Sequence, residues 1–391
     1  MRRLLTAAPF LLLAACGLNG TDTDNDDDAA APAAAQAASD DPDFAEFEAV
    51  EIADSQPRPE MRLQVVLDRL GFGPGVVDGR PGLSTDNALK GFQEANGLEV
   101  TGELDTATRE ALARWDNVAA TKVVRIPASW GDIRYRATPE EPEDQAKLDR
   151  LGYENLDEKL AERFHTTPEV LRQLNQGGRP AGSPVQNEAD APRPQATPTP
   201  SSADGGEAPE PALFRPGQLV RVPNIGPGTI QAATDDDQDW RRTLASLGVA
   251  ADQPEAARVV VDKSEGVLRA FDDQDQLIAL FTVTSGSQHD PLPIGEWKVL
   301  GVAHNPPFAY DPELFWDVPD DEEKQQLPPG PNGPVGVAWI DLSKGHYGIH
   351  GTPEPQTIGR AQSHGCVRLT NWDVARLAGM VSGSTEVIFQ A

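Results

Sequence analysis

The chain has 391 residues, and at roughly 150 residues per domain this length predicts two or three domains. It carries 33 basic and 62 acidic residues, and the formal net charge of −29 would repel a polyanion, so we expect no nucleic-acid partner. The 35 prolines occur mainly in patches, which is typical of linkers between folded units. We interpret the acidic runs at residues 22–28 and 235–239 as solvated tether and linker.

The first 16 residues have the pattern of an export signal. Arg2 and Arg3 precede a mainly apolar stretch, residues 4–15, that is too short to span a bilayer as a helix. The stretch ends in Leu13-Ala14-Ala15-Cys16-Gly17, which resembles a bacterial lipobox. The resemblance implies that Cys16 is lipidated, and that the protein is anchored in the periplasm by its lipid, with the outer membrane favoured because glycine rather than aspartate follows. The alternative is an ordinary secretory signal, which also predicts export.

Cysteine usage gives a first indication of chemistry. The two cysteines are Cys16 and Cys366. If Cys16 is acylated, Cys366 has no disulfide partner, and a lone thiol in an oxidising compartment suggests a catalytic residue.

The next part of the chain divides by composition. Residues 17–58 are rich in Ala, Asp and Pro, so we expect a disordered tether. Residues 59–115 have apolar residues at helical spacing in three stretches, which predicts a small all-α three-helix bundle. The bundle resembles the peptidoglycan-binding domain found beside many wall hydrolases, which implies peptidoglycan as a partner. A bundle that only packs on its neighbour is the alternative. The matching stretches are residues 67–72, 77–79, 89–93 and 97–102.

Residues 120–225 are less regular. Residues 161–175 resemble the middle of a lysin motif and residues 215–223 resemble its second half, which implies glycan binding. A Pro/Ala/Ser-rich insertion, residues 178–211, separates them and is interpreted as disordered. Because the insertion departs from the family pattern, a degenerate spacer is the alternative.

Residues 257–391 have many short apolar runs, which predict a mainly-β sandwich or barrel-like domain. One helix is expected at residues 372–381, with Thr370 as its N-cap. The expected strands are residues 258–262, 267–271, 277–285, 296–302, 335–342, 347–350 and 385–389.

Chemistry-bearing residues concentrate near Cys366. Three of the six histidines, His346, His350 and His364, lie within twenty residues of it. A cysteine nucleophile needs a base and donors for the oxyanion, and Gly365 suits a tight turn whose backbone N–H groups could supply those donors. His350 ends an expected strand, and a loop of fifteen residues can return the chain to it, so we assign His350 as the base. We expect His364 to support catalysis or contact substrate, and His346 to lie at the surface or in the core.

These residues resemble the signature of the L,D-transpeptidase (YkuD-type) catalytic domain. The resemblance implies that Cys366 attacks a stem tetrapeptide and releases D-Ala, and that an amine resolves the thioester, forming a 3–3 cross-link. It also implies that the Gly351 carbonyl orients His350, that Gly365 and Cys366 supply oxyanion N–H groups, and that no cofactor or metal is needed. Arg368 and Ser363 are expected to bind substrate; a solvated or structural Arg368 is the alternative. The matching stretches are Ile349-His350-Gly351-Thr352, Ser363-His364-Gly365-Cys366, Arg368, Ser285-Gly286, Pro293-Ile294-Gly295 and Asn305-Pro306-Pro307.

Four rival interpretations stay open at this point. Water could resolve the thioester, which would make the protein an L,D-carboxypeptidase or cross-link hydrolase. A lysine of a wall-attached outer-membrane lipoprotein could be the acceptor amine. The histidines and Cys366 could instead bind zinc, although their spacing matches neither zinc fingers nor zincins. Finally, the chain could be a wall-binding lipoprotein with an inactive catalytic domain.

Overall fold

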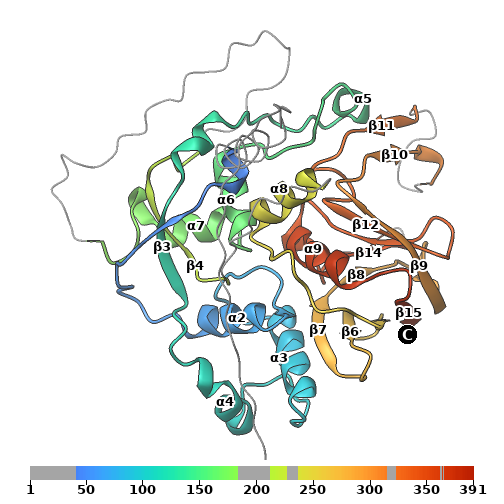
Figure 1. Cartoon of the computed structure of the whole chain (residues 1–391), viewed down its shortest axis with the longest axis horizontal. Helices are drawn as coiled ribbons and strands as arrows, with labels where there is room; N and C mark the ends of the chain where they lie inside the picture. The colour runs from blue at the N-terminus through green and yellow to red at the C-terminus, as the bar shows by residue number, and fades with distance from the viewer. Residues whose placement is uncertain (1–40, 184–211, 227–236, 315–322, 362, 364) are drawn as a thin grey trace, which may run out of the picture.

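The computed structural model describes residues 41–183, 212–226, 237–314, 323–361, 363 and 365–391 (Figure 1). The export signal with Cys16, the first part of the expected tether, most of the insertion at 178–211, and His364 lie outside the described residues. Among the described residues, no helix is long and apolar enough to cross a membrane.

The C-terminal part of the chain forms the expected mainly-β domain around one large sheet. Strands β7 and β8 are separated by the single residue Val283, yet they lie near opposite ends of the strand order, so the sheet must curl back on itself. The sheet order is β2 (Phe72–Gly73), β7 (Leu277–Thr282), β6 (Val267–Phe271), β5 (Arg258–Asp262), β15 (Glu386–Gln390), β9 (Gly295–His304), β12 (Ala338–Leu342), β13 (Gly348–His350), β14 (Val367–Arg368) and β8 (Thr284–Ser285).

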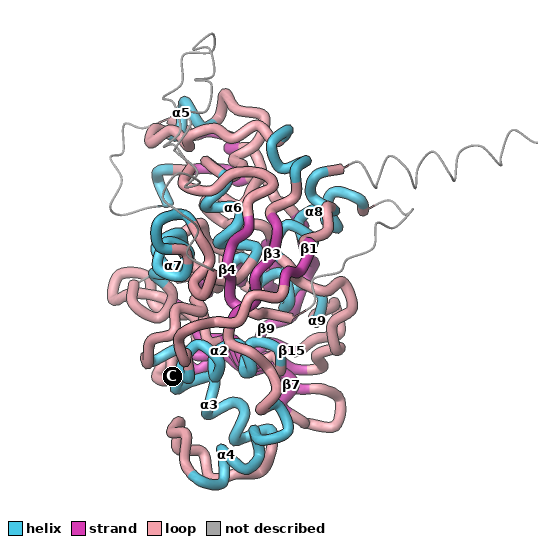
Figure 2. Tube along the Cα trace, turned by 90° about the vertical axis from the view of Figure 1, so that its left-hand side faces the viewer, coloured by secondary structure: helices cyan, strands magenta, loops and turns pink. Residues whose placement is uncertain are grey.

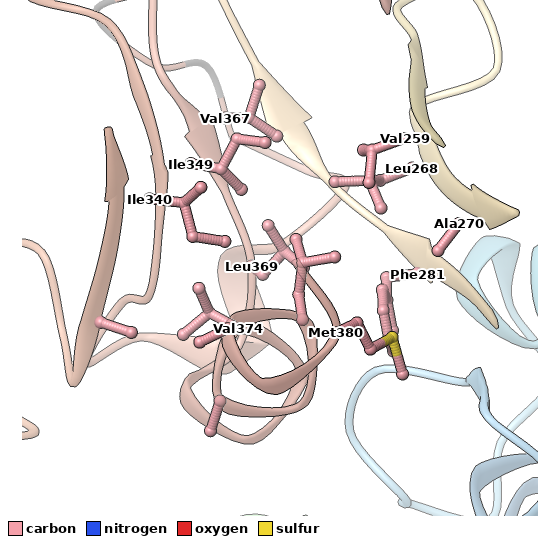
Figure 3. Packing of buried hydrophobic residues seen from close by; sticks show 14 of the residues in the cluster. Val259, Leu268, Ala270, Phe281, Ile340, Ile349, Val367, Leu369, Val374 and Met380 are labelled. Carbon is pink, nitrogen blue, oxygen red and sulfur yellow. The ribbon is translucent and has the colours of Figure 1, made fainter. Parts of the chain in front are cut away.

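Helix α9 (Asn371–Met380) packs against the inner face of this sheet (Figure 3). Its N-cap is Thr370, whose hydroxyl accepts the N–H of Asp373 at 3.1 Å, as its position in the sequence predicts. Alternate strand residues such as Ile340, Ile349 and Val367 meet Leu369 and Val374 in one continuous core. The opposite face of β12–β14 is therefore available for polar side chains.

The expected three-helix unit is present as α2 (Pro59–Arg69), α3 (Leu83–Ala95) and α4 (Thr106–Leu112). This helical module is joined to the sheet, since β2 pairs in parallel with β7 and places Phe72 opposite Leu280. A Cβ on Gly91 of α3 would lie only 2.8 Å from Cβ of Leu280, so the helix packs directly on that strand. The module thus extends the large C-terminal sheet by one strand.

The middle region contains β3 (Thr121–Arg125), α5 (Pro142–Gln145), α6 (Leu156–Arg163), α7 (Pro168–Leu174) and β4 (Leu219–Pro223). Strands β3 and β4 pair antiparallel, and β1 (Glu48–Val50) adds to β3, so the three strands lie side by side (Figure 2). Asn175 donates to the Arg221 carbonyl at 2.8 Å and accepts the Arg221 N–H at 2.7 Å. The two segments that resemble parts of a lysin motif therefore belong to one folded unit, despite the insertion between them.

Two expectations drawn from composition, a disordered tether and a solvated linker, were wrong for the residues that the structure describes. Residues 41–58 were expected in a disordered tether, but β1 pairs with β3 and the guanidinium of Arg221 donates to the Ile52 and Ala53 carbonyls. Strand pairing, a buried arginine and the packing of Phe47 against Trp130 and Phe164 order this segment. The end of the acidic run at 235–239 is not a linker, because Asp237 caps α8 (Gln238–Leu247) and Asp239 accepts a hydrogen bond from Asn305.

The remaining elements are short. Strands β10 (Phe308–Tyr310) and β11 (Gln325–Leu327) form an antiparallel pair that the sequence analysis did not predict. The 3-10 helices are η1 (Pro42–Phe44), η2 (Ala113–Trp115), η3 (Ala128–Asp132), η4 (Gln176–Gly178), η6 (Pro312–Leu314) and η7 (Pro355–Thr357).

The helical module, the middle region and the C-terminal domain meet at a buried ionic cluster. Asp68 of α2 accepts hydrogen bonds from Arg376 of α9 at 3.0 and 3.1 Å, and lies 3.0 Å from Nδ1 of His165, which follows α6. The His165 ring stacks on Trp372 with the ring centroids 5.1 Å apart. Burial alone would raise the pKa of Asp68, but Arg376 and His165 hold it well below its usual range.

We predict that Asp68→Ala destabilises the whole chain. The substitution leaves the Arg376 guanidinium buried without its bidentate partner, which costs about 3–5 kcal/mol. Urea unfolding followed by far-UV circular dichroism measures the loss. Asp116→Ala is the control, because its ion pair with Arg62 is exposed and removing it costs about 0–1 kcal/mol. Equal losses in the two variants would contradict the prediction.

Candidate active site

The pairing of β13 with β14 places the predicted catalytic residues on one face. The strands run parallel, with Ile349 opposite Val367 and His350 opposite Arg368. Ile349 and Val367 point into the core (Figure 3). Because side chains alternate along a strand, His350 and Arg368 point to the other face, and Cys366, just before β14, is expected to share it. The structure thus brings together residues that are sixteen positions apart in the chain.

His350 is held as a neutral base. Its Nδ1 lies 2.7 Å from the carbonyl oxygen of Gly351, which is the contact expected from the sequence. Nδ1 must donate to that carbonyl, so the lone pair of the neutral ring is on Nε2. Trp339, opposite His350 on β12, stacks on the ring with centroids 5.4 Å apart. Burial, together with the charge of Arg368, lowers the pKa of His350 to about 4, against the opposing effect of the Gly351 hydrogen bond.

Cys366 is a partly buried free thiol. It donates to the carbonyl oxygen of His346, with 3.8 Å between Sγ and O. Burial raises the pKa of the thiol above its ordinary value. A backbone hydrogen bond with Gly348 and the charge of Arg368 act in the opposite direction but do not offset the burial. The resting site is therefore a neutral thiol beside a neutral imidazole, and the thiol needs a base before it can attack.

The turn before Cys366 is fixed by two residues. Gly365 has φ +97°, and a Cβ there would lie 2.7 Å from Cε1 of Tyr347, so the position requires glycine. Ser363 was expected to bind substrate, but its side chain is buried. Its hydroxyl donates to the Cys366 carbonyl at 2.6 Å and accepts the Gly286 N–H at 2.6 Å. Both contacts lie within the protein, which favours a role in holding the turn.

The structure also bears on the expectations for Arg368, His364 and a metal site. Arg368 lies close enough to His350 and Cys366 for its charge to lower both pKa values, so it belongs to the site. His364 lies outside the described residues, and its role stays a prediction. The described residues contain no group of three or more His, Cys, Asp or Glu side chains that could hold a metal ion.

The sequence interpretation missed two neighbours of His350. Trp339 could have been found from the strand pattern, since an aromatic residue between the apolar Ala338 and Ile340 must point away from the core. Asn371 at the start of α9 is fully buried, and its side chain contacts the backbone of Gly351, next to His350, and of Gly336 and Val337 before β12. Its local sequence gives no signal beyond its place after the helix cap.

We predict that Arg368→Ala shifts the reactivity of Cys366 to higher pH. Removing the positive charge raises the pKa of the thiol, so less thiolate is present at neutral pH. The rate of alkylation by iodoacetamide between pH 5 and 10 measures the shift in a chain carrying Cys16→Ser, which leaves Cys366 as the single thiol. Arg368→Lys keeps the charge and should stay close to the parent. An unchanged profile in Arg368→Ala would show that Arg368 does not act on the thiol.

Two segments of the chain match known domain families. Residues 256–389 match the YkuD family, described as an L,D-transpeptidase catalytic domain, and residues 61–112 match a peptidoglycan binding domain. The Bacillus licheniformis protein YkuD, which is named as an L,D-transpeptidase, is 54% identical to this chain where the two align. The alignment covers 33% of this chain and 63% of YkuD. YqjB of Bacillus subtilis, also named as an L,D-transpeptidase, is 29% identical over 33% of this chain and 69% of its own.

A solved L,D-transpeptidase from Mycobacterium smegmatis is 24% identical over 34% of this chain and 58% of its own, with a TM-score of 0.28. The chain spans under two thirds of the length of the first relative. Residues 256–389 are therefore an L,D-transpeptidase catalytic domain of the YkuD family, and residues 61–112 are a peptidoglycan-binding domain.

Proposed function

We propose that this protein is a peptidoglycan L,D-transpeptidase that works through a thioester on Cys366. The observation that carries the proposal is the pairing of β13 with β14, which brings a neutral, oriented His350 to the strand beside the free thiol. This arrangement lies within an L,D-transpeptidase catalytic domain, and the same chain carries a peptidoglycan-binding domain. The substrate is a stem tetrapeptide of the wall.

In the first half-reaction, Nε2 of His350 takes the thiol proton while Sγ attacks the carbonyl carbon of stem residue three. The negative charge forms on the carbonyl oxygen, and the backbone N–H groups of Gly365 and Cys366 are the expected donors to it. When the tetrahedral adduct collapses, the peptide bond to D-Ala breaks and His350 gives its proton to the departing amine. The product is a thioester between Cys366 and the shortened stem, with D-Ala released.

In the second half-reaction, the side-chain amine of residue three on another stem attacks the thioester carbonyl. His350 takes a proton from this amine and returns it to the departing sulfur, so the enzyme regains its thiol. The new amide bond is a 3–3 cross-link. Since the pKa of His350 is lowered to about 4, the base is ready at neutral pH and is lost only as the pH falls through that value.

Two other acceptors use the same acylation machinery. Water would release a tripeptide, which is the L,D-carboxypeptidase or cross-link hydrolase reaction. A lysine amine of an outer-membrane lipoprotein would attach that protein to the wall. The peptidoglycan-binding domain favours the stem amine, because a wall strand held by the enzyme supplies a high local concentration of acceptor stems.

We predict that the chain carrying Cys16→Ser converts stem-tetrapeptide muropeptides to cross-linked dimers with release of D-Ala, as detected by mass spectrometry. Cys366→Ala should abolish both products, because no thioester can form. Release of D-Ala without dimers would favour hydrolysis. Absence of turnover in both proteins would contradict the proposed enzyme and favour a wall-binding role.

We also propose that the protein is exported to the periplasm and held by lipid on Cys16, with the outer membrane as the favoured site. The support is the sequence of residues 1–17 alone: a positively charged start, a short apolar stretch and a lipobox-like end.

We predict that cells expressing the full chain incorporate a clickable palmitate analogue into it, and that Cys16→Ser removes this label. Cys366→Ser is the matched control, because it deletes the other cysteine and should leave the label intact. Label that survives in Cys16→Ser, or a chain that remains in the cytoplasm, would contradict the proposed anchor.

A further inference from the structure

The backbone that orients His350 packs on the side-chain amide of Asn371. Gly351, whose carbonyl accepts from His350, also donates its N–H to the Val335 carbonyl at 3.0 Å. A Cβ on Gly351 or on Gly336 would overlap Oδ1 of Asn371, so both glycine backbones lie directly against the amide oxygen. The same oxygen accepts the N–H of Val337 at 3.3 Å. The Asn371 amide therefore fixes the distance between two loops that hold the base.

The other end of this amide reaches the middle region. Nδ2 of Asn371 donates to the Pro331 carbonyl at 3.1 Å and lies 3.4 Å from Oε2 of Glu162 on α6. Glu162 and Asn371 are 209 positions apart in the chain, and both are buried. Burial raises the pKa of Glu162 to about 8, helped by the charge of Glu158, so the carboxyl is mainly protonated at neutral pH. A neutral carboxyl can remain in this site without a cationic partner.

The middle region also holds the segment that leads to these loops. Leu151 donates to the Pro329 carbonyl at 2.9 Å, and Asn332 donates its backbone N–H to the Leu151 carbonyl at 3.0 Å. The side-chain amide of Asn332 donates to the Gly152 carbonyl at 3.0 Å. A Cβ on Gly330 would overlap the Leu151 carbonyl, so the two backbones are in direct contact. Residues 329–332 are thus fastened to the middle region immediately before the chain reaches Gly336.

We propose that Glu162 and Asn371 are positioning residues for the catalytic base: Glu162 holds the Asn371 amide, and that amide holds the Gly351 backbone that orients His350. The proposal rests on the proposed role of His350. It gives the middle region a part in catalysis that does not require it to bind glycan. Neither residue touches the thiol or the substrate; both act through the position of the Gly351 carbonyl.

The test compares Glu162→Ala with Glu162→Gln in the full chain carrying Cys16→Ser. Glutamine keeps an acceptor oxygen in the place of a protonated carboxyl, whereas alanine removes it. The first readout is the rate of Cys366 acylation by a carbapenem, since a small misplacement of a catalytic group costs about tenfold or more. We expect a loss of about tenfold in Glu162→Ala, a larger loss in Asn371→Ala, and a rate within about twofold of the parent in Glu162→Gln.

The second readout does not depend on turnover. Nitrogen NMR of the imidazole rings reports whether His350 carries its proton on Nδ1, and the signal is assigned by its absence in His350→Gln. We expect a single Nδ1–H tautomer in the parent and in Glu162→Gln, and a mixture of tautomers in Glu162→Ala. If the parent shows this tautomer but is not acylated, the proposed enzymatic function fails while the positioning role is still judged by the NMR.

A general loss of stability is controlled with Leu174→Ala. Leu174 is buried in the hydrophobic core of the middle region and lies on α7, whereas Glu162 lies on α6 and Asn371 on α9. We expect Leu174→Ala to lower the melting temperature while leaving the acylation rate and the tautomer unchanged. The proposal is overturned if Leu174→Ala slows acylation as much as Glu162→Ala, or if Glu162→Ala matches the parent in both readouts.

Discussion

The active site depends on a parallel strand pairing that is only two residues long. Ile349 pairs with Val367 and His350 with Arg368, and the intervening loop connects them. So short a ladder has little stability of its own, and its register is set by what surrounds it. On one side Ile349 and Val367 are locked in the core; beyond the ladder, Leu369 donates to the His350 carbonyl at 2.9 Å. At the turn, Ser363 ties Cys366 to Gly286. A slip of one residue would turn the thiol towards the core.

The electrostatics of the site follow from this placement. Burial favours the neutral form of both partners, so it lowers the pKa of His350 and raises that of Cys366. The positive charge of Arg368 lowers the pKa of both groups, which favours the charged form of Cys366 and the neutral form of His350. It helps the thiolate to form, and it makes the imidazolium less stable, so His350 gives up readily a proton that it has taken. A pair of this kind keeps the thiol protonated, and therefore less open to oxidation, until substrate arrives.

Much of the architecture could be predicted because it is local. The strands around Val259 and Ile388 follow from short apolar runs, and the cap at Thr370 from residue type and position. The Cys366 and His350 pair could be proposed because residue types and their spacing limit the chemistry. The ordered structure of residues 41–58 could not be predicted from the sequence, because it depends on hydrogen bonds from Arg221, which is far along the chain. The surroundings of Asn371 could not be predicted either. Its neighbours come from three distant segments, so they leave no pattern in the sequence near residue 371.

The pairing of β2 with β7 has a consequence for how the wall is handled. The peptidoglycan-binding domain is not hung on a flexible linker; it contributes a strand to the sheet that carries the cysteine, and α3 rests on that sheet (Figure 1). Under the proposed function, a glycan strand bound by this domain is held at a fixed distance and orientation relative to Cys366. Only the stems that reach Cys366 at that distance would then react, so the rigid join between the two domains would set the spacing of the cross-links.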